Sequence, residues 1–372
     1  MRTKQRTPVK KDTTDITLFV RTSNEDVVQW NRQKIVDALL LETYVDGDTA
    51  EAISREVEKQ IFSSGIATLT APLIRELVNA RLIERGLEHA RRAHARLGFP
   101  LYDIGNLIAH RNRENANVPH WPEGTNLTLA LGIKREYALN SVFSQDVSDA
   151  HLSGDFHLHN LGYIDRPYCS AQSLEHIKEH GIDLPNLSSR AKPARHAEVL
   201  LAHMVRFSAA LQGNFAGPIE WKAVNVCFAP YITGWTDEQV RQLVQMLIFE
   251  FSQLAVSRGG QVMYTNLHVH WDIPDETAAR AAIGPGGIPT GRKYGEYVKD
   301  ARRLAWAMME VYLRGDAGNK PFFFPKPVLH VSASMFREAG AKDFLRHACN
   351  AAADKGNPFF VLDRTPPAGE GL

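Results

Sequence analysis

The sequence predicts an α/β protein whose larger domain is an α/β barrel or a doubly wound sheet. The main observation is that apolar runs of strand length alternate with helical patterns from residue 151 to residue 362. Residues 16–105 differ, because they show one hairpin followed by consecutive helical patterns. A length of 372 residues suffices for about two to three domains.

The composition indicates a globular protein from a reducing compartment. Hydrophobic residues make up 44% and charged residues 23%, and the net charge of +1 argues against nucleic-acid binding. No apolar run approaches the length of a membrane-spanning helix, and the basic residues 1–15 lack the apolar core of a signal peptide, so we expect a disordered tail there. Three cysteines without a C-x-x-C pair favour reduced thiols and a cytoplasmic location.

The first domain is predicted over residues 16–105. A β-hairpin spans residues 16–30 around a polar turn at 22–26, and Asn31 is the expected N-cap of the first helix. Apolar spacing predicts further helices around Val57, after Thr70 and over residues 87–97.

This pattern resembles the ATP-cone, the regulatory nucleotide-binding domain of ribonucleotide reductases. The matching segments are FVR (19–21), WNRQKIV (30–36), LT (69–70) and IRELV (74–78), whereas the hairpin turn RTSN (21–24) departs from the usual Lys-Arg-x-Gly. The resemblance implies that Val20, Arg21 and Lys34 bind ATP or dATP as allosteric effectors, with the two cations on the triphosphate. Cations beside a helix N-terminus suit an anion. The alternative is that both are solvated surface charges.

Residues 106–150 are polar and rich in Asn and Pro, so we expect an irregular linker before a larger domain at 151–372. That domain should begin with a strand at 155–159, followed by a loop that carries Cys169. The later expectations are helices at 194–212, 237–254, about 296–315 and 336–355, strands at 221–229, 262–271, 327–332 and 358–362, and a flexible Gly/Pro-rich loop at 284–295. Thr236 and Gln239 form a capping box for the second of these helices, and Gly259 and Gly260 should end it.

Two His-x-His pairs are candidate metal ligands. Period-2 alternation puts His157 and His159 on one strand face, and His268 and His270 on another. A carboxylate such as Asp155 or Asp272 could complete a site, which would fit a metal-dependent hydrolase. The alternative, which we favour, is that the histidines are hydrogen-bonded structural residues.

Cys169 is the candidate reactive thiol. It lies in a loop with little apolar company, and Arg166 nearby would favour a thiolate. Cys227 in an apolar strand and Cys349 on a helix face are instead expected to pack in the core. The residues alone leave a functional thiol and an incidental cysteine equally open at position 169.

The larger domain resembles anaerobic (class III) ribonucleoside-triphosphate reductases, a glycyl-radical family. The matching segments, in order, are GDFHLHNLGY (154–163), PYC (167–169), GPIEW (217–221), APY (229–231), RGGQV (258–262), TN (265–266), FPKP (324–327) and GNPFF (356–360). The resemblance implies part of a ten-stranded α/β barrel around a finger loop. A thiyl radical on that loop takes the 3′ hydrogen of a ribonucleoside triphosphate, and the 2′ hydroxyl leaves as water.

In this resemblance Cys169 matches the second cysteine, which supplies reducing equivalents, with formate or a thiol system as reductant. His157, His159, Ser170, Gly259, Gly260 and Gln261 match the substrate or effector region, and no metal ligand is implied among them. The implied partners are a radical-SAM activating enzyme and a second copy of the chain in a homodimer, with no nucleic acid or membrane.

The sequence departs from the family where it stops at Leu372. The thiyl cysteine, the radical glycine in Arg-x-x-Gly-Tyr and the four-cysteine zinc site do not occur in it, so we expect the N-terminal part of a reductase, inactive alone and dependent on a complementary C-terminal part. Exposed strand edges would then make the part prone to aggregation. The alternatives are the metal-dependent hydrolase and a non-catalytic nucleotide sensor.

Overall fold

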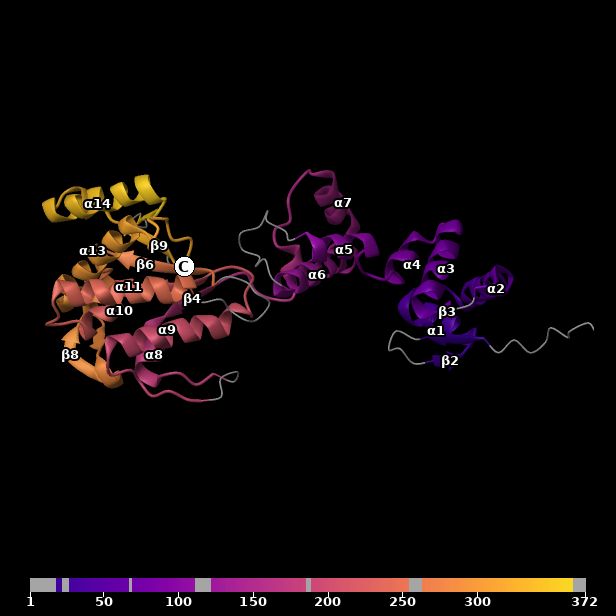
Figure 1. Ribbon diagram of the computed structural model, residues 1–372, viewed down its shortest axis with the longest axis horizontal. Helices are drawn as coiled ribbons and strands as arrows, with labels where there is room; N and C mark the ends of the chain where they lie inside the picture. The colour runs from indigo at the N-terminus through magenta and orange to yellow at the C-terminus, as the bar shows by residue number, and fades with distance from the viewer. Residues whose placement is uncertain are drawn as a thin grey trace, which may run out of the picture. The chain divides into compact units, whose positions relative to one another are not determined.

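The computed structural model describes residues 18–21, 27–66, 69–110, 122–184, 189–253 and 263–363 (Figure 1). The chain divides into two compact units, residues 1–100 with 132–161 and residues 101–131 with 162–372. The described helices include none that combines the length and apolar character needed to cross a bilayer.

The first unit contains a small three-stranded sheet and the helices that cover it. Strands β1 (Phe19–Arg21) and β2 (Val27–Gln29) pair antiparallel, and β3 (Leu69–Thr70) adds parallel to β1. The hairpin is confirmed, whereas β3 was not expected. The helices are α1 (Gln33–Glu42), α2 (Gly47–Ser64), α3 (Ala71–Glu84) and α4 (Glu88–Ala93), as the apolar spacing predicted.

Side-chain caps and one apolar core hold these helices in place. Asn31 Oδ1 accepts a hydrogen bond from the backbone N–H of Gln33 at 2.9 Å, and Thr70 Oγ1 accepts one from Leu73 at 3.3 Å. The spacing of apolar residues places one stripe of each helix in a common core. Its buried members are Val20, Ile35, Val36, Leu39, Ala50, Ile53, Val57, Ile61, Leu69, Val78, Leu82 and Ala90.

The prediction of an irregular linker at 106–150 is wrong for the residues described. Helices α5 (Leu101–Ala109), α6 (Pro122–Tyr137) and α7 (Gln145–Ser153) occupy most of this region, and a π-helix (Ala138–Val142) extends α6. Pro122 begins α6, where a missing N–H costs nothing. Only Gly124 of α6 is buried, so the helix has no apolar stripe that could reveal it in the sequence. The domain boundaries remain a prediction.

The predicted strand at 155–159 is also wrong. Helix α7 runs to Ser153 and ends on Gly154, whose φ of 88° is left-handed, and the backbone N–H of Asp155 still bonds to Ala150. The following residues are irregular up to a 3₁₀ turn at Leu161–Tyr163. Residues 155–159 alternate between apolar and polar side chains, but among the described residues this segment belongs to no sheet.

The second unit is built on a parallel five-stranded sheet. Its strands are β4 (Ser170–Ser173), β5 (Ile219–Lys222), β6 (Thr265–His270), β9 (Lys326–Val331) and β10 (Phe359–Leu362), and they lie in the sheet in chain order. A doubly wound sheet reverses its strand order at a switch point, whereas a barrel keeps chain order. The sheet therefore has the winding of part of an α/β barrel.

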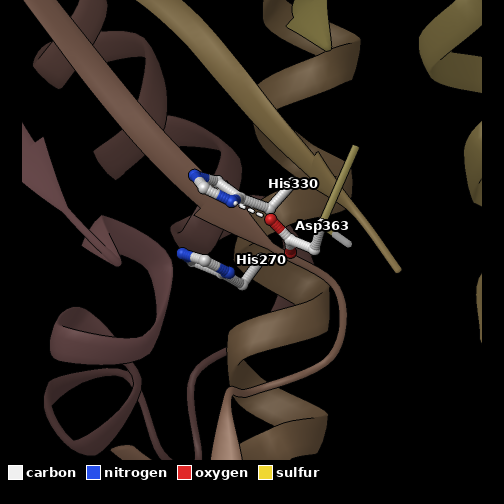
Figure 2. A group of neighbouring side chains, drawn as sticks. All are labelled: His270, His330 and Asp363. Carbon is white, nitrogen blue, oxygen red and sulfur yellow. Dashed lines mark hydrogen bonds and ion pairs between the residues drawn. The ribbon is translucent and has the colours of Figure 1, made fainter. Parts of the chain in front are cut away.

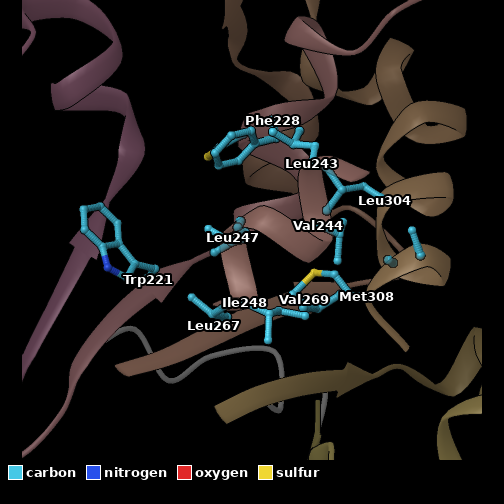
Figure 3. Close-up of a cluster of buried hydrophobic side chains, with 14 of the residues drawn as sticks. Trp221, Phe228, Leu243, Val244, Leu247, Ile248, Leu267, Val269, Leu304 and Met308 are labelled. Carbon is cyan, nitrogen blue, oxygen red and sulfur yellow. The ribbon is translucent and has the colours of Figure 1, made fainter. Parts of the chain in front are cut away.

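Long helices cover one face of this sheet. They are α9 (Ala197–Gln212), α11 (Asp237–Gln253), α13 (Val298–Arg314) and α14 (Ala339–Lys355), all close to the predicted ranges. The capping box of α11 is confirmed, since Thr236 N–H bonds Gln239 Oε1 and Gln239 N–H bonds Thr236 Oγ1. Trp221, Leu267 and Val269 project from the strands into the core between sheet and helices (Figure 3).

Three further predictions in this unit need correction or lie outside the described residues. The strand predicted at 221–229 ends at Lys222, because Ala223 takes a left-handed φ of 46° and starts the short helix α10 (Val224–Phe228). The predicted loop at 284–295 contains a hairpin of β7 (Ala281–Ile283) and β8 (Pro289–Lys293). The expected glycine stop of α11 at Gly259 and Gly260 falls outside the described residues.

The smaller elements complete the second unit. They are α8 (Leu174–His180), α12 (Asp275–Ala279) and 3₁₀ turns at Ala229–Tyr231, Pro285–Gly287, Tyr294–Tyr297 and Ala333–Phe336. At the end of the described sheet, the four residues of β10 are all exposed, with Leu362 64% exposed. This apolar strand agrees with the expectation that part of a barrel exposes apolar strand surface.

Candidate functional site

A cavity of about 290 Å³ lies in the first unit between the hairpin, α1 and α3. Val20, Ile35 and Val78 give it an apolar wall, and Trp30 lies beside them. Its polar lining includes three cationic side chains, Lys34, Arg75 and Arg96, together with Gln29, Asn31 and His94. An apolar wall beside several cations suits a ligand with a flat ring system and an anionic tail.

Two of the three predicted effector residues line this cavity. Val20 is a buried residue of β1, and Lys34 lies in the first turn of α1 with an exposed side chain. Arg21 follows Val20 in β1, but its side chain lies outside the described part of the structure. Lys34 and Arg96 form no ion pair with a described residue, so both remain available to an anion.

A hydrogen-bonded network beside the cavity joins Arg75 and His94, which line it, to Glu42, and no sequence pattern indicated these three residues. Arg75 donates to both carboxylate oxygens of Glu42 at 2.6 and 2.9 Å and to the backbone oxygen of His94 at 2.9 Å. The hydrogen bond from Arg75 holds the pKa of Glu42 below its usual value, and burial lowers the pKa of His94. Glu42 therefore neutralises Arg75, and His94 is uncharged at neutral pH.

The second candidate site is the sheet face opposite the helices. In the register Glu220 pairs with Asn266, and His270 pairs with His330. Alternation along β6 places Asn266, His268 and His270 on this polar face, while Leu267 and Val269 point into the core. The predicted common face of His268 and His270 is confirmed. In an α/β barrel, the face opposite the helices is the inner one.

The histidines of this face belong to one contact network. His268 Nδ1 lies 2.8 Å from His330 Nε2, and His330 Nδ1 lies 2.8 Å from Asp363 Oδ1. The ring of His270 stacks on that of His330 with 4.1 Å between centroids (Figure 2). Burial lowers the pKa of His270 to about 4, and the proximity of His330 adds to this effect. His330 and Asp363 were missed because nothing local to their segments indicates the register that joins them to β6.

The carboxylates suggested for a metal site do not join these histidines. Burial opposes ionisation of Asp272, but hydrogen bonds from Ser332, Ser334 and Arg302 outweigh it and lower its pKa. Asp155 belongs to the first unit, where it accepts a bond from Ser153 at 2.8 Å. There the exposed rings of His157 and His159 lie 5.6 Å apart without a strand, and His151 lies 5.5 Å from His157.

Cys169 is exposed and directly precedes β4, so it lies before a strand rather than after one. Ser170 begins β4, and its hydroxyl accepts a hydrogen bond from the Gln172 amide. Arg166 donates to the backbone oxygen of Gly213 at 2.9 Å and to Asp165 at 3.1 Å, so its guanidinium already has acceptors. The exposure of Cys169 agrees with the loop prediction.

Of the other two cysteines, one is buried and one is exposed. Cys227 is buried on α10 beside Lys178, and burial raises the pKa of its thiol to about 11, in agreement with the packing prediction. The core prediction for Cys349 is wrong, because this residue is exposed on α14 next to the buried stripe that contains Ala348. No cysteine belongs to a group of three or more potential metal ligands among the described residues. These residues therefore do not fit a four-cysteine zinc site.

Comparison with protein families decides the identity of this fold. The model of the anaerobic ribonucleoside-triphosphate reductase family matches residues 114–370, and the ATP cone domain model matches residues 18–96. The chain belongs to the anaerobic ribonucleoside-triphosphate reductase family. Its first unit carries the family's ATP-cone, and the parallel sheet lies in the reductase region. Membership favours the reductase over the hydrolase and the sensor.

Solved structures of anaerobic ribonucleotide reductases share the fold at low identity. The Thermotoga maritima enzyme in complex with dATP and CTP is 16% identical, with a TM-score of 0.48 over 91% of this chain and 51% of that one. The same enzyme with MES in the active site is 16% identical, with a TM-score of 0.50 over 71% and 45%. The chain thus spans about half the length of these reductases. A search of curated proteins found no match.

Proposed function

We propose that this chain supplies the effector-binding domain and the first five barrel strands of an anaerobic ribonucleoside-triphosphate reductase. ATP or dATP binds in the cavity of the ATP-cone, and a ribonucleoside triphosphate is reduced at the polar sheet face. The observation that carries the proposal is the cavity, where Val20 and Lys34, both derived from the ATP-cone resemblance, line one pocket with Arg96.

Charge supports the placement of the effector triphosphate. Glu42 already neutralises Arg75, so Lys34 and Arg96 are the cations left to contact phosphate oxygens. The apolar wall of Val20, Ile35 and Val78 suits the base. We place Arg21 with Lys34 on the triphosphate because both follow the ATP-cone pattern.

The proposed reductase site uses Cys169 as the thiol that supplies reducing equivalents, with formate or a thiol system as the final reductant. Cys169 lies two residues before Ala171, the register partner of Glu220, so an extended backbone directs its thiol toward the polar face. We assign Ser170, His157 and His159, together with Gly259, Gly260 and Gln261, to the substrate region on the family pattern alone. A glycyl radical supplies the radical chemistry in this family, and a radical-SAM activating enzyme, a homodimer and a cytoplasmic location complete the proposal.

Isothermal titration of dATP and ATP into the purified chain tests the effector pocket. A charge-assisted hydrogen bond contributes about 1.5–3 kcal/mol, so Lys34→Ala and Arg96→Ala should each weaken dATP binding about tenfold or more. Lys59→Ala, which removes an exposed cation of α2 outside the cavity, is the matched control and should bind normally. Unchanged affinity in the Lys34→Ala/Arg96→Ala double variant would place the effector elsewhere.

The thiol assignment is tested separately in reductase assembled with its activating enzyme. Cys169→Ser should abolish formation of deoxyribonucleotide while dATP binding stays intact. Cys349→Ser removes a second exposed thiol and should leave turnover unchanged. Turnover by the Cys169→Ser variant would remove Cys169 from the reaction.

A further inference from the structure

The carboxyl ends of three neighbouring strands bring together three side chains that can bind a metal ion. His270 is the last residue of β6, His330 is the last but one of β9, and Asp363 directly follows β10. One potential ligand atom of each lies within 4.8 Å of those of the other two. Figure 2 shows the Asp363 carboxylate beside both imidazole rings.

His270 has a nitrogen without a partner at this site. The residue is only 8% exposed, and its Nδ1 is buried with no hydrogen bond to any described residue. A buried polar atom left unsatisfied costs about 1–3 kcal/mol. Its neighbours are the His330 ring and the Asp363 carboxylate, so a cation between the three groups would satisfy it (Figure 2).

A second buried nitrogen on the same face also has no partner. His268 Nδ1 and His330 Nε2 lie 2.8 Å apart, and His330 Nδ1 lies 2.8 Å from Asp363 Oδ1. The other nitrogen of His268, Nε2, is 3.7 Å from Glu220 Oε2, which is too long for a hydrogen bond, and it is buried without a partner among the described residues. The polar face therefore leaves two imidazole nitrogens unsatisfied, and the one on His270 faces His330 and Asp363.

We propose that His270, His330 and Asp363 bind a divalent first-row transition metal ion of the Zn²⁺ class. Two imidazoles and one carboxylate are a frequent donor set for Zn²⁺ and Fe²⁺, whereas Mg²⁺ and Ca²⁺ prefer oxygen ligands. His268 orients His330 by accepting its Nε2–H at Nδ1, over a distance of 2.8 Å. The ion joins β6, β9 and β10 and holds the exposed strand β10 to the sheet.

Other histidine groups could bind the same ion and must be separated from this one. The exposed His176 and His180 lie one turn apart on α8, with 4.8 Å between ring centroids. His151, His157 and His159 form the group in the first unit. Both are more exposed than His270, and the comparison variants therefore remove them.

The test is a titration of Zn²⁺ into tag-free, chelator-stripped chain at neutral pH, with Co²⁺ as an optical probe. The chain and its His176→Gln/His180→Gln and His151→Gln variants should each bind one equivalent, and Zn²⁺ should raise their melting temperature. His270→Gln and Asp363→Asn should bind at least tenfold more weakly and lose both the Co²⁺ visible bands and the thermal shift. Asp363 is an exposed position, so its variant folds and keeps the test valid.

Three outcomes would overturn the proposal. They are full Zn²⁺ binding by both His270→Gln and Asp363→Asn, loss of binding in either comparison variant, and no binding by the unchanged chain. None of these outcomes affects dATP binding in the ATP-cone, so failure here is distinct from failure of the proposed function.

Discussion

Arg75 and Glu42 form a two-bond guanidinium–carboxylate pair between α3 and α1, with N–O distances of 2.6 and 2.9 Å. Each side chain is 29% exposed, so the pair is shielded more than a surface ion pair. It joins the two helices that form the sides of the effector cavity. The pair therefore couples the stability of the ATP-cone to the shape of its pocket.

Loss of this pair should destabilise the ATP-cone. Glu42→Gln leaves Arg75 without its carboxylate, and a hydrogen bond to a charged group contributes about 1.5–3 kcal/mol. Hydrogen exchange of α1 and α3 should show local opening easier by about that amount. Glu56→Gln removes a more exposed pair with Arg85 at 2.6 Å and should change opening by under about 0.5 kcal/mol. Equal effects of the two variants would contradict this account.

The ATP-cone should lose stability on acidification. Its folded state lowers the pKa of His94 from the usual 6.5 and that of Glu42 from the usual 4.5. For both groups the unfolded chain binds protons more readily, so stability is fully present above these values and falls as the pH drops through the lowered ones. The dATP-free melting temperature should therefore decrease below about pH 6.5. His94→Gln should flatten the upper part of the profile, and an unchanged profile would exclude His94 as its cause.

One buried hydrogen bond in the second unit should make a measurable contribution to the free energy of unfolding. Trp221 donates its indole N–H to Ser208 Oγ at 2.8 Å, and both side chains are buried. Ser208→Ala leaves the indole unpartnered, so it should lower the free energy of unfolding by about 1–3 kcal/mol. Ser252→Ala on α11, an exposed position with only a local bond to Phe249, should stay within about 0.5 kcal/mol. Urea unfolding of the two variants measures both changes in the free energy of unfolding.

Removal of the buried charge of Lys178 should strongly destabilise the second unit. Its ammonium is fully buried, donates to the Cys227 carbonyl at 2.9 Å and to Tyr294 Oη at 2.6 Å, and lies 3.7 Å from Glu175. Lys178→Met removes the buried one of the two cations beside the largely buried Glu175 and leaves only the exposed Arg280, 3.6 Å away, so it should cost about 3–5 kcal/mol. Adding Glu175→Gln removes the stranded charge and should recover part of the loss in urea unfolding. A double variant that is less stable than Lys178→Met would show that the pair is not the cause.

Local patterns predicted those elements whose own residues carry the signal. The apolar stripe of α2 and the Thr236 cap of α11 are complete within their helices, and both are found where expected. Helix α6 was missed because almost none of it is buried. The alternation at 155–159 resembles a strand, but a strand needs a neighbour to pair with, and the chain turns at Gly154 instead.

The candidate sites likewise contain residues that could be predicted and residues that could not. Val20 and Lys34 were predicted from the ATP-cone resemblance, whose matching segments cover the hairpin and the start of α1, and both line the cavity. Register between distant strands decides that His270 meets His330 and Asp363, and no local pattern encodes that register. Arg75 was overlooked for a similar reason, since its partner Glu42 lies on another helix.

The agreement between strand order in the sheet and strand order in the chain has a consequence for biosynthesis. Strands β4, β5, β6, β9 and β10 leave the ribosome in the order in which they lie side by side. Each new strand therefore finds its partner already synthesised, and the helix between them can dock on a surface that already exists. The sheet can grow by one strand at a time during translation, without waiting for any distant segment to emerge.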